Sequence, residues 1–290
     1  MANVAIGLPV YNGANYLAAA IESILQQSYG DFELVISDNA STDGTEEVCR
    51  ELARGDERIV YHRQSENIGL LPNFVATIRL ARGEYFRWLG DDDWLAPDAI
   101  SRSVQAFAAD ERLVLVTSSV EYIGPDGSTS SGAYDGTGLG DADPVVRFGE
   151  WLRLLNESHL VLDPLYGMVR RAPVAPFARR PMLGEDEVFA ARLALLGPWA
   201  HLPEVLVRRH RGEERAADIG RRLGLPGWHP RVALALQSRE LLRLVREAGL
   251  TPAQRRRADA TVGRWYVRRQ GRTAVRRTRK LARLVLKSSS

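Results

Sequence analysis

The 290-residue sequence contains a single cysteine, Cys49, and this scarcity excludes two structural devices. One thiol cannot form an intrachain disulfide, and it cannot supply a thiolate metal cluster. A protein without disulfides suits a reducing compartment, so we expect a cytoplasmic location.

Long apolar runs are also missing from the sequence. Polar residues interrupt every apolar stretch well before the roughly 20 residues that a membrane-spanning helix needs. Residues 1–7 lack the basic start and long apolar core of a secretory signal. We therefore expect neither secretion nor a spanning helix.

The glycine-rich loops by which many enzymes hold phosphates are absent as well. No Gly-x-x-x-x-Gly-Lys-Ser/Thr motif occurs, and no Gly-x-Gly-x-x-Gly follows the first apolar run. These absences argue against a P-loop enzyme and against a dinucleotide dehydrogenase. A nucleotide ligand would need another means of holding its phosphates, and a metal ion held by acidic residues is the evident one.

Acidic residues are nearly absent from the C-terminal end. Residues 251–290 carry 13 Lys or Arg against Asp259 alone, a net charge of +12, which leaves −9 for the first 250 residues within the total of +3. Such a basic tail is typical of contact with an anionic membrane or a nucleic acid, and a solvated basic helix is the plainer alternative.

Apolar runs typical of strands alternate with helical periodicity through the first 120 residues. This alternation predicts an α/β fold with a mostly parallel sheet flanked by helices. The strands are predicted at residues 4–10, 32–36, 58–62, 84–89 and 113–117.

The rest of the chain is less regular. The glycine- and serine-rich residues 124–143 predict a long loop, which is either a flap on the acceptor side or a disordered insertion. An inner strand is predicted at 166–169. Helices are predicted at residues 145–155, 186–196, 231–248 and 251–287.

Three of the predicted strands end in polar residues. They are followed by Asn12-Gly13, by Ser37-Asp38-Asn39 and by Gly90-Asp91-Asp92-Asp93. Because the carboxyl ends of parallel strands meet at one edge of a sheet, we expect a ligand site there. Consecutive carboxylates are costly to ionise unless a cation neutralises them, which favours Mg²⁺ or Mn²⁺; a solvated acidic turn with Asp93 as a helix cap is the alternative.

Five short segments of the chain form a recognisable series. They are residues 8–12 (LPVYN), 37–45 (SDNASTDGT), 67–69 (NIG), 81–85 (ARGEY) and 91–97 (DDDWLAP). In order and spacing they resemble the GT-A glycosyltransferases of family two. The resemblance covers about residues 3–210 and implies a Rossmann-like GT-A fold. It implies a nucleotide-sugar half over about residues 1–97, an acceptor half over 98–210 and a helical C-terminal region over 211–290.

The resemblance implies inverting transfer of a sugar from a nucleoside diphosphate to an acceptor hydroxyl, and it assigns roles to individual residues. Asp92 is the foremost metal ligand, with Asp93 as a second. Gly90 and Ser37 stand where the family often has aspartate, so the division of labour between Asp91 and Asp93 stays open. The residues implied in nucleotide-sugar binding are Pro9, Tyr11, Asn12, Asp38, Asn67, Asp91 and Asp92.

Inverting transfer needs a general base to deprotonate the acceptor hydroxyl. The run Gly184-Glu185-Asp186-Glu187 resembles the family's Glu-Asp motif, so Asp186 is implied as the base and Glu185 as the second choice. The alternative is that these acids only complement a helix dipole. His210, among arginines, is either a metal ligand or a surface histidine.

Two other functions are weighed against this one. A nucleotidyltransferase would also use acidic residues and a metal, and an inactive module would only bind sugar nucleotides or nucleic acid. The acceptor stays open among a glycan, a lipid-linked sugar, a protein and a natural product.

The tail allows two kinds of partner. Its charge favours peripheral attachment to the inner face of a membrane over binding to nucleic acid, with Trp265 and Tyr266 among the interfacial contacts. Alternatively, these apolar residues pack on the catalytic domain or on a second subunit, which leaves a homodimer open.

Overall fold

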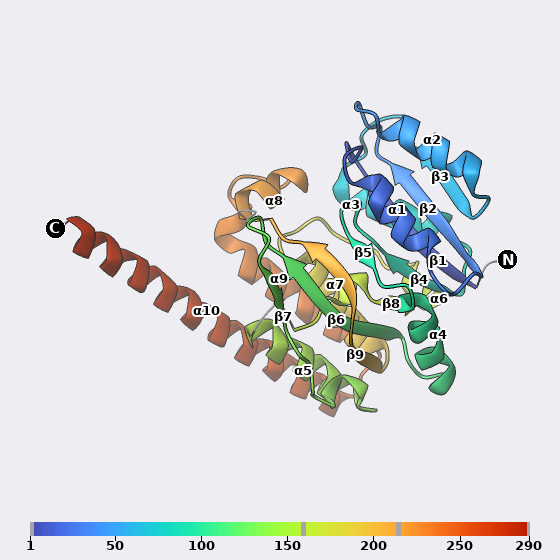
Figure 1. Cartoon of the computed structure of the whole chain (residues 1–290). Helices are drawn as coiled ribbons and strands as arrows, with labels where there is room; N and C mark the ends of the chain where they lie inside the picture. The colour runs from blue at the N-terminus through green and yellow to red at the C-terminus, as the bar shows by residue number, and fades with distance from the viewer. Residues whose placement is uncertain (1–2, 158–160, 213–215, 289–290) are drawn as a thin grey trace.

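One nine-stranded mixed sheet organises the protein, and helices cover both of its faces (Figure 1). The computed structural model describes residues 3–157, 161–212 and 216–288, with side chains as far as residue 272. The predicted α/β class is confirmed, and helices link the strands of the N-terminal half.

The N-terminal half of the sheet is parallel, with its strands in the order β3-β2-β1-β4. All seven residues of β1 are buried because helices cover the sheet on both sides, which explains the continuous apolar run. The elements are β1 (Val4–Val10), α1 (Leu17–Leu25), β2 (Phe32–Asp38), α2 (Thr45–Gly55), β3 (Ile59–Arg63), α3 (Leu70–Leu80) and β4 (Tyr85–Trp88).

The second half of the sheet mixes both strand directions. β8 (Met168–Arg170) runs antiparallel between β4 and β6 (Leu115–Ile123), and β9 (Trp199–His210) runs parallel to β6. Two short strands, β5 (Trp94–Leu95) and β7 (Thr129–Ser131), pair antiparallel with β9 and β6. The predicted parallel arrangement therefore describes the N-terminal half, and β5, β7 and β9 were not predicted.

The helices of this half and of the C-terminal region complete the fold. They are α4 (Ala99–Ala109), α5 (Pro144–Glu157), α6 (Arg171–Val174), α7 (Glu185–Leu196), α8 (Ala216–Arg222), α9 (His229–Glu247) and α10 (Pro252–Ser288), with 3-10 turns η1 (Gly138–Gly140) and η2 (Pro164–Tyr166). None of the described helices is long and apolar enough to cross a membrane.

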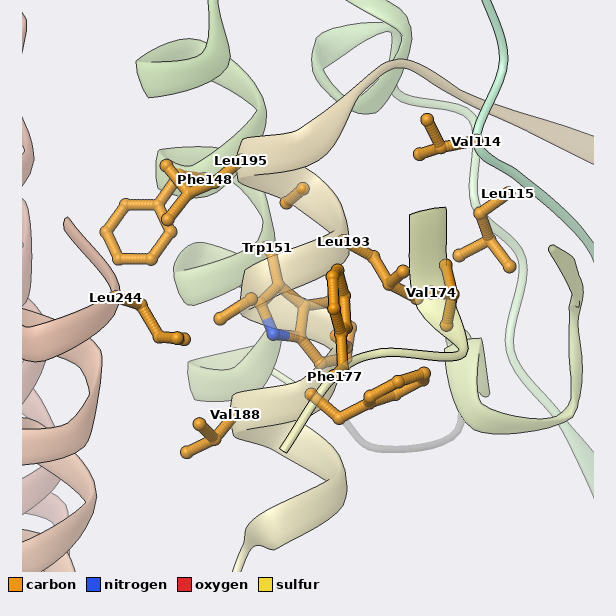
Figure 2. Packing of buried hydrophobic residues seen from close by; sticks show 14 of the residues in the cluster. Val114, Leu115, Phe148, Trp151, Val174, Phe177, Val188, Leu193, Leu195 and Leu244 are labelled. Atoms are coloured by element: carbon orange, nitrogen blue, oxygen red, sulfur yellow. The ribbon is translucent and has the colours of Figure 1, made fainter. Parts of the chain in front are cut away.

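An apolar core joins the C-terminal helices to the sheet. Figure 2 shows Trp151 of α5, Val188 of α7 and Leu244 of α9 packing together. α10 adds Val262 and Trp265 to this core, and Trp265 is only 2% exposed. Each large apolar side chain buried in this way contributes about 1.5–3 kcal/mol, so the start of α10 is held firmly against the sheet-covering helices.

The end of α10 projects from the body of the protein (Figure 1). Of the aromatic residues expected at a membrane surface, Trp265 is instead buried in the core and Tyr266 packs against it. These two residues therefore pack on the body of the protein, which was the alternative to contact with a membrane. Leu281, Leu284 and Val285, the further apolar residues that we expected at a membrane surface, lie beyond the described side chains.

Candidate functional site

The acidic turn after β4 lies directly against the turn after β1. A Cβ atom on Gly13 would fall 2.3 Å from Oδ2 of Asp91, so only the missing side chain of Gly13 leaves room for that carboxylate. The Gly13 amide donates to Oγ1 of Thr45 at 2.9 Å, which ties this turn to the start of α2. As predicted, the polar turns that follow β1 and β4 are in direct contact.

Asp91 sits in an environment that disfavours its negative charge. Burial raises the pKa of Asp91 to about 6, and the neighbouring charges of Asp92 and Asp93 raise it further. Arg222 of α8 opposes this rise, so the C-terminal region comes close enough to influence the acidic turn electrostatically. A carboxylate with a raised pKa in such a cluster would be stabilised by a bound cation.

His210, at the end of β9, lies beside the acidic turn. Its Nδ1 is 2.7 Å from the main-chain oxygen of Asp92, and because a carbonyl only accepts, Nδ1 carries the proton. Nε2, the other ring nitrogen, has no hydrogen-bond partner among the described residues. His210 and Asp92 are 118 positions apart in the sequence, and the pairing of β5 with β9 brings them together.

Asp93 faces the interior, where Arg209 holds its carboxylate. Oδ2 of Asp93 accepts from Nε of Arg209 at 2.9 Å and from the Gly90 amide at 3.1 Å. Arg209 also pairs with Asp163, and its guanidinium stacks 3.6 Å from the ring centre of Tyr166. Burial opposes the charge on Arg209, but Tyr166, Asp163 and Asp93 together raise its pKa, so it stays cationic.

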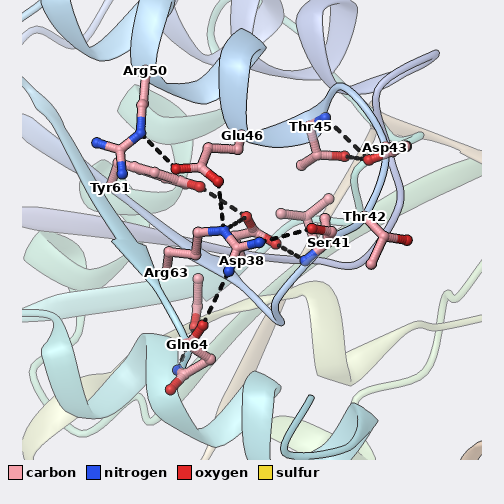
Figure 3. Close-up of polar contacts among 12 residues, drawn as sticks. Asp38, Ser41, Thr42, Asp43, Thr45, Glu46, Arg50, Tyr61, Arg63 and Gln64 are labelled. Carbon is pink, nitrogen blue, oxygen red and sulfur yellow. Dashed lines mark hydrogen bonds and ion pairs between the residues drawn. The ribbon is translucent and has the colours of Figure 1, made fainter. Parts of the chain in front are cut away.

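Asp38 is fully buried and acts as a hub for the loop after β2, as Figure 3 shows. Its carboxylate accepts from the Ser41 amide and from the hydroxyl of Tyr61, both at 2.8 Å, and lies 3.5 Å from Nε of Arg63. Burial raises the pKa of Tyr61, and its hydrogen bond to Asp38 raises it further. No part of the Asp38 side chain is exposed. The carboxylate that the resemblance assigned to the nucleobase is therefore covered by protein atoms in this structure.

The other residues expected in the nucleotide pocket lie around this hub. Asn12, at a positive φ of 55°, accepts from the Thr42 amide at 2.9 Å. Asn67 accepts from the side-chain amide of Asn39 at 3.0 Å. Pro9 is buried in β1, whereas Tyr11 is 48% exposed and presents its ring at the surface.

Three acids open α7, and two of them are already paired. Glu185 accepts from Nε of Arg179 at 2.6 Å, and Glu187 pairs with Arg269 at 2.9 Å. Asp186 has no side-chain partner among the described residues. The expected second choice, Glu185, is thus engaged, and the expected base, Asp186, is available.

Asp186 is accessible to solvent, yet protein atoms crowd around it. Their displacement of water raises its pKa to about 6, with further contributions from the negative charges of Glu187, Asp163 and Glu185. Asp163 therefore influences Asp186 and is itself paired with Arg209, which holds Asp93. Asp93, Arg209, Asp163 and Asp186 thus form one chain of charges between the acidic turn and α7.

This arrangement coincides with a family match. Residues 5–156, more than half of the chain, match the profile described as glycosyl transferase family 2. The chain belongs to this family. It is therefore an enzyme that transfers glycosyl groups, and the expected resemblance is confirmed.

Individual relatives of this glycosyltransferase match over shorter segments. A chondroitin synthase of Pasteurella multocida is 33% identical over 132 residues, which are 46% of this chain and 14% of that protein. The abequosyltransferase RfbV of Salmonella typhimurium is 43% identical over 98 residues, which are 32% of this chain and 29% of the relative. The matches thus span well under half of the relatives' own length.

Solved structures show the same fold as this glycosyltransferase. S. aureus TarS in complex with UDP-GlcNAc aligns with a TM-score of 0.67 at 15% identity, covering 91% of this chain and 72% of TarS. A mannosyltransferase from Pyrobaculum calidifontis in complex with GDP-Man and Mn²⁺ aligns with a TM-score of 0.53 at 18% identity, covering 98% and 81%.

Two residues of the candidate site, Arg209 and Asp163, carry no clear signal in the sequence. Arg209 lies within a run of basic residues, Arg208-Arg209-His210-Arg211. Asp163 precedes Pro164, a pair that reads as an ordinary turn. Its contact with Arg209 spans 46 positions, so no local pattern marks it.

Proposed function

We propose that this glycosyltransferase moves a sugar from a nucleoside diphosphate to an acceptor hydroxyl with inversion at the anomeric carbon. In this proposal residues 1–97 bind the donor, residues 98–210 bind the acceptor, and residues 211–290 form an appended helical region. The observation that carries it is the pair of separate carboxylate sites, Asp91 with Asp92 and Asp186, joined by one chain of charges.

The residues of the acidic turn fit a divalent cation. Asp91 and Asp92 supply carboxylate oxygens, which Mg²⁺ and Mn²⁺ prefer. Burial raises the pKa of Asp91, and the negative charges of Asp92 and Asp93 raise it further, so a cation would stabilise its ionised form. His210 lies beside this turn, with Nδ1 2.7 Å from the main-chain oxygen of Asp92. Among the described residues no three His, Cys, Asp or Glu form a ready-made cluster, so most positions would be left for the diphosphate.

Asp93 has a different role in this proposal from the metal ligand implied by the resemblance. Its Oδ2 accepts from Arg209, and its buried Oδ1 has no hydrogen-bond partner among the residues that the structure describes. We assign Asp92 and Asp91 to the cation, with His210 beside them. We assign Asp93 to holding the acidic turn in place through Arg209 and the Gly90 amide. A bound divalent ion would supply positive charge for the leaving diphosphate.

The protein's own groups would carry the acceptor step. Asp186 accepts the proton of the acceptor hydroxyl on Oδ1 or Oδ2 while the acceptor oxygen attacks the anomeric carbon. Its raised pKa makes it a stronger base than an ordinary aspartate, and it stays mostly ionised at neutral pH. Arg179 keeps Glu185 occupied, which leaves Asp186 as the carboxylate free to act.

The donor nucleotide would rest on the network around Asp38. Asn12 and Asn67 hold the loops that end β1 and precede α3, and Tyr11 offers an exposed ring for a base or ribose. Asp38 then acts through the Ser41 loop that it holds rather than by touching the base. The UDP-GlcNAc complex of TarS supports a nucleotide-sugar donor by fold similarity.

We also propose that the basic end of α10 attaches the enzyme to an anionic membrane surface. The support is the net charge of +12 over residues 251–290 and the projection of α10 from the body (Figure 1). Each Lys or Arg near such a surface contributes about 1 kcal/mol, so a few engaged residues give reversible attachment.

Release of nucleoside diphosphate from a panel of UDP-, GDP- and dTDP-sugars tests the donor and cation assignments. We expect turnover with Mg²⁺ or Mn²⁺, its loss in excess chelator, and a loss of about 10²-fold or more in kcat for Asp92→Asn. Asp98→Asn, an exposed carboxylate paired with Arg102, serves as the matched control. Full activity in chelator, or a near-normal Asp92→Asn enzyme, contradicts the cation assignment.

A further inference from the structure

A cleft of about 560 Å³ opens beside residues 124–143, which the sequence predicted as a long loop. β6 and the start of β9 form one wall, and residues 134–141 form the other. Its volume lies within the about 300–1,000 Å³ typical of small-molecule sites. The lining residues with polar or aromatic side chains that matter here are Thr117, Tyr134, Asp135, Asp141, Trp199 and His201.

This cleft is distinct from the donor site. Thr117 pairs in register with His201, whereas Ile123 pairs with His210 beside the acidic turn. Six residues of β6 separate these two positions, a distance of about 20 Å along the strand. The cleft therefore opens toward the opposite end of β6 and β9.

His201 presents a defined hydrogen-bonding atom at the cleft. The Thr117 hydroxyl donates to the Ala200 carbonyl at 3.3 Å, so it accepts from Nδ1 of His201 at 3.0 Å. Burial lowers the pKa of His201, which keeps the ring neutral at physiological pH. Nε2 then carries a lone pair, and its nearest described partner, Oγ of Ser119, lies at the long distance of 3.5 Å.

Hydrogen-bond acceptors and an apolar surface occur together in the lining. The carboxylates of Asp135 and Asp141 are exposed acceptors. The ring of Tyr134 stands edge-on to His201 with centroids 5.7 Å apart and gives an apolar surface.

The charge of the lining selects among ligand classes. None of the described lining residues is Lys or Arg, and two are Asp, so phosphate groups and acidic sugars would be repelled. No three metal-binding side chains gather there among the described residues, so the carboxylates form no ready-made cation site. A neutral sugar remains, since it combines hydroxyl donors and acceptors with an apolar C–H face.

We propose that this cleft binds a neutral oligosaccharide, and that it holds the part of a glycan acceptor remote from the transfer site. The binding itself is independent of catalysis, and its assignment to the acceptor rests on the proposed function. The glycine-rich residues 134–141 thereby gain a role, as the wall that the sugar contacts.

Binding of neutral tetrasaccharides to the full chain, measured by calorimetry without donor, tests this proposal. The probes are maltotetraose, mannotetraose, cellotetraose and chitotetraose, with a heparin tetrasaccharide as the anionic comparison. We expect at least one neutral probe to bind and the heparin probe to bind at least tenfold more weakly. Asp135→Asn and His201→Gln should each weaken the neutral probe severalfold, and Asp31→Asn, another exposed carboxylate, should not.

Donor affinity is measured on the same proteins to separate this proposal from the proposed function. Asp135→Asn and His201→Gln should bind the nucleotide sugar as the unaltered chain does, because the cleft lies about 20 Å along β6 from the donor site. Asp135 is exposed, so its variant tests the cleft even if one at His201 unfolds. Absence of binding by every neutral probe, or equal binding by both variants, overturns the inference whatever the donor result.

Discussion

Arg209 on β9 donates from Nε to the buried Oδ2 of Asp93 at a distance of 2.9 Å. The two residues lie 116 positions apart, one on β9 and the other in the acidic turn. Arg209 also pairs with Asp163, whose charge raises the pKa of Asp186. The partly buried Arg209 thus lies between the acidic turn and the start of α7, which are the two candidate sites.

Replacement of Arg209 tests this coupling through stability. Arg209→Met leaves Asp93 and Asp163 without their shared cation, and breaking a buried pair costs about 3–5 kcal/mol. We expect a matching loss in the free energy of unfolding, measured by urea denaturation. Arg208→Met is the control, since Arg208 is half exposed and pairs with Glu121 at the surface; it should change stability by about 1 kcal/mol or less. Equal losses in the two variants would contradict a structural role for Arg209.

Gly13 offers a steric test of the acidic turn. In Gly13→Ala the new Cβ would lie 2.3 Å from Oδ2 of Asp91, so the carboxylate must move. A shift of about 1 Å can cost about 10²-fold in rate, and we expect kcat to fall by about 10-fold or more. In Gly30→Ala the Cβ would have no other heavy atom within 4 Å, so kcat should stay unchanged. A fully active Gly13→Ala enzyme would show that Asp91 has no fixed role in turnover.

The pH dependence of turnover reports on Asp186. A general base works only when deprotonated, and since its pKa is raised to about 6, kcat/KM for the acceptor should fall as pH drops through that value. Glu187→Gln removes the largest like charge acting on Asp186, which lowers its pKa and moves the acid limb to lower pH. Glu247→Gln, at an exposed pair with Arg243, should leave the limb in place. A limb that stays fixed or moves upward in Glu187→Gln would argue against Asp186.

Truncation after residue 272 tests membrane attachment without disturbing the core. It removes six of the 13 basic residues of the tail and keeps Trp265, which the core buries. We expect the full chain to pellet with anionic vesicles, less so as salt screens the charges, and the truncated chain to pellet much less. Equal pelleting of both proteins would rule out attachment through the tail end.

The N-terminal half could be predicted from sequence because its signals are local. β1 is apolar at every position since both faces of the sheet are covered, and its polar end marks the site edge. β9 gave no such signal. Pro203 interrupts it, and register shifts around Ser119 break its pairing with β6, so inward and outward residues do not alternate cleanly.

Within the candidate site, too, local features could be predicted from the sequence and long-range contacts could not. The acidic motifs indicated a candidate site, but the sequence could not show which of the three adjacent acids at the start of α7 has no side-chain partner among the described residues. That depends on Arg179 for Glu185 and on Arg269 for Glu187, and Arg269 comes from the distant helix α10. The burial of Asp38 and the contact of Arg209 with Asp93 are likewise long-range features of the folded chain.

The central claim is that Asp186 serves the acceptor while the donor binds elsewhere, and one paired measurement on Asp186→Asn tests it most directly. Donor affinity is measured by calorimetry, and transfer is measured as nucleoside diphosphate release in the presence of acceptor. We predict donor affinity within about twofold of the unaltered enzyme and a loss of about 10²-fold or more in transfer, with Glu185→Gln retaining most transfer. Loss of donor binding in Asp186→Asn, or transfer at the normal rate, would contradict the account.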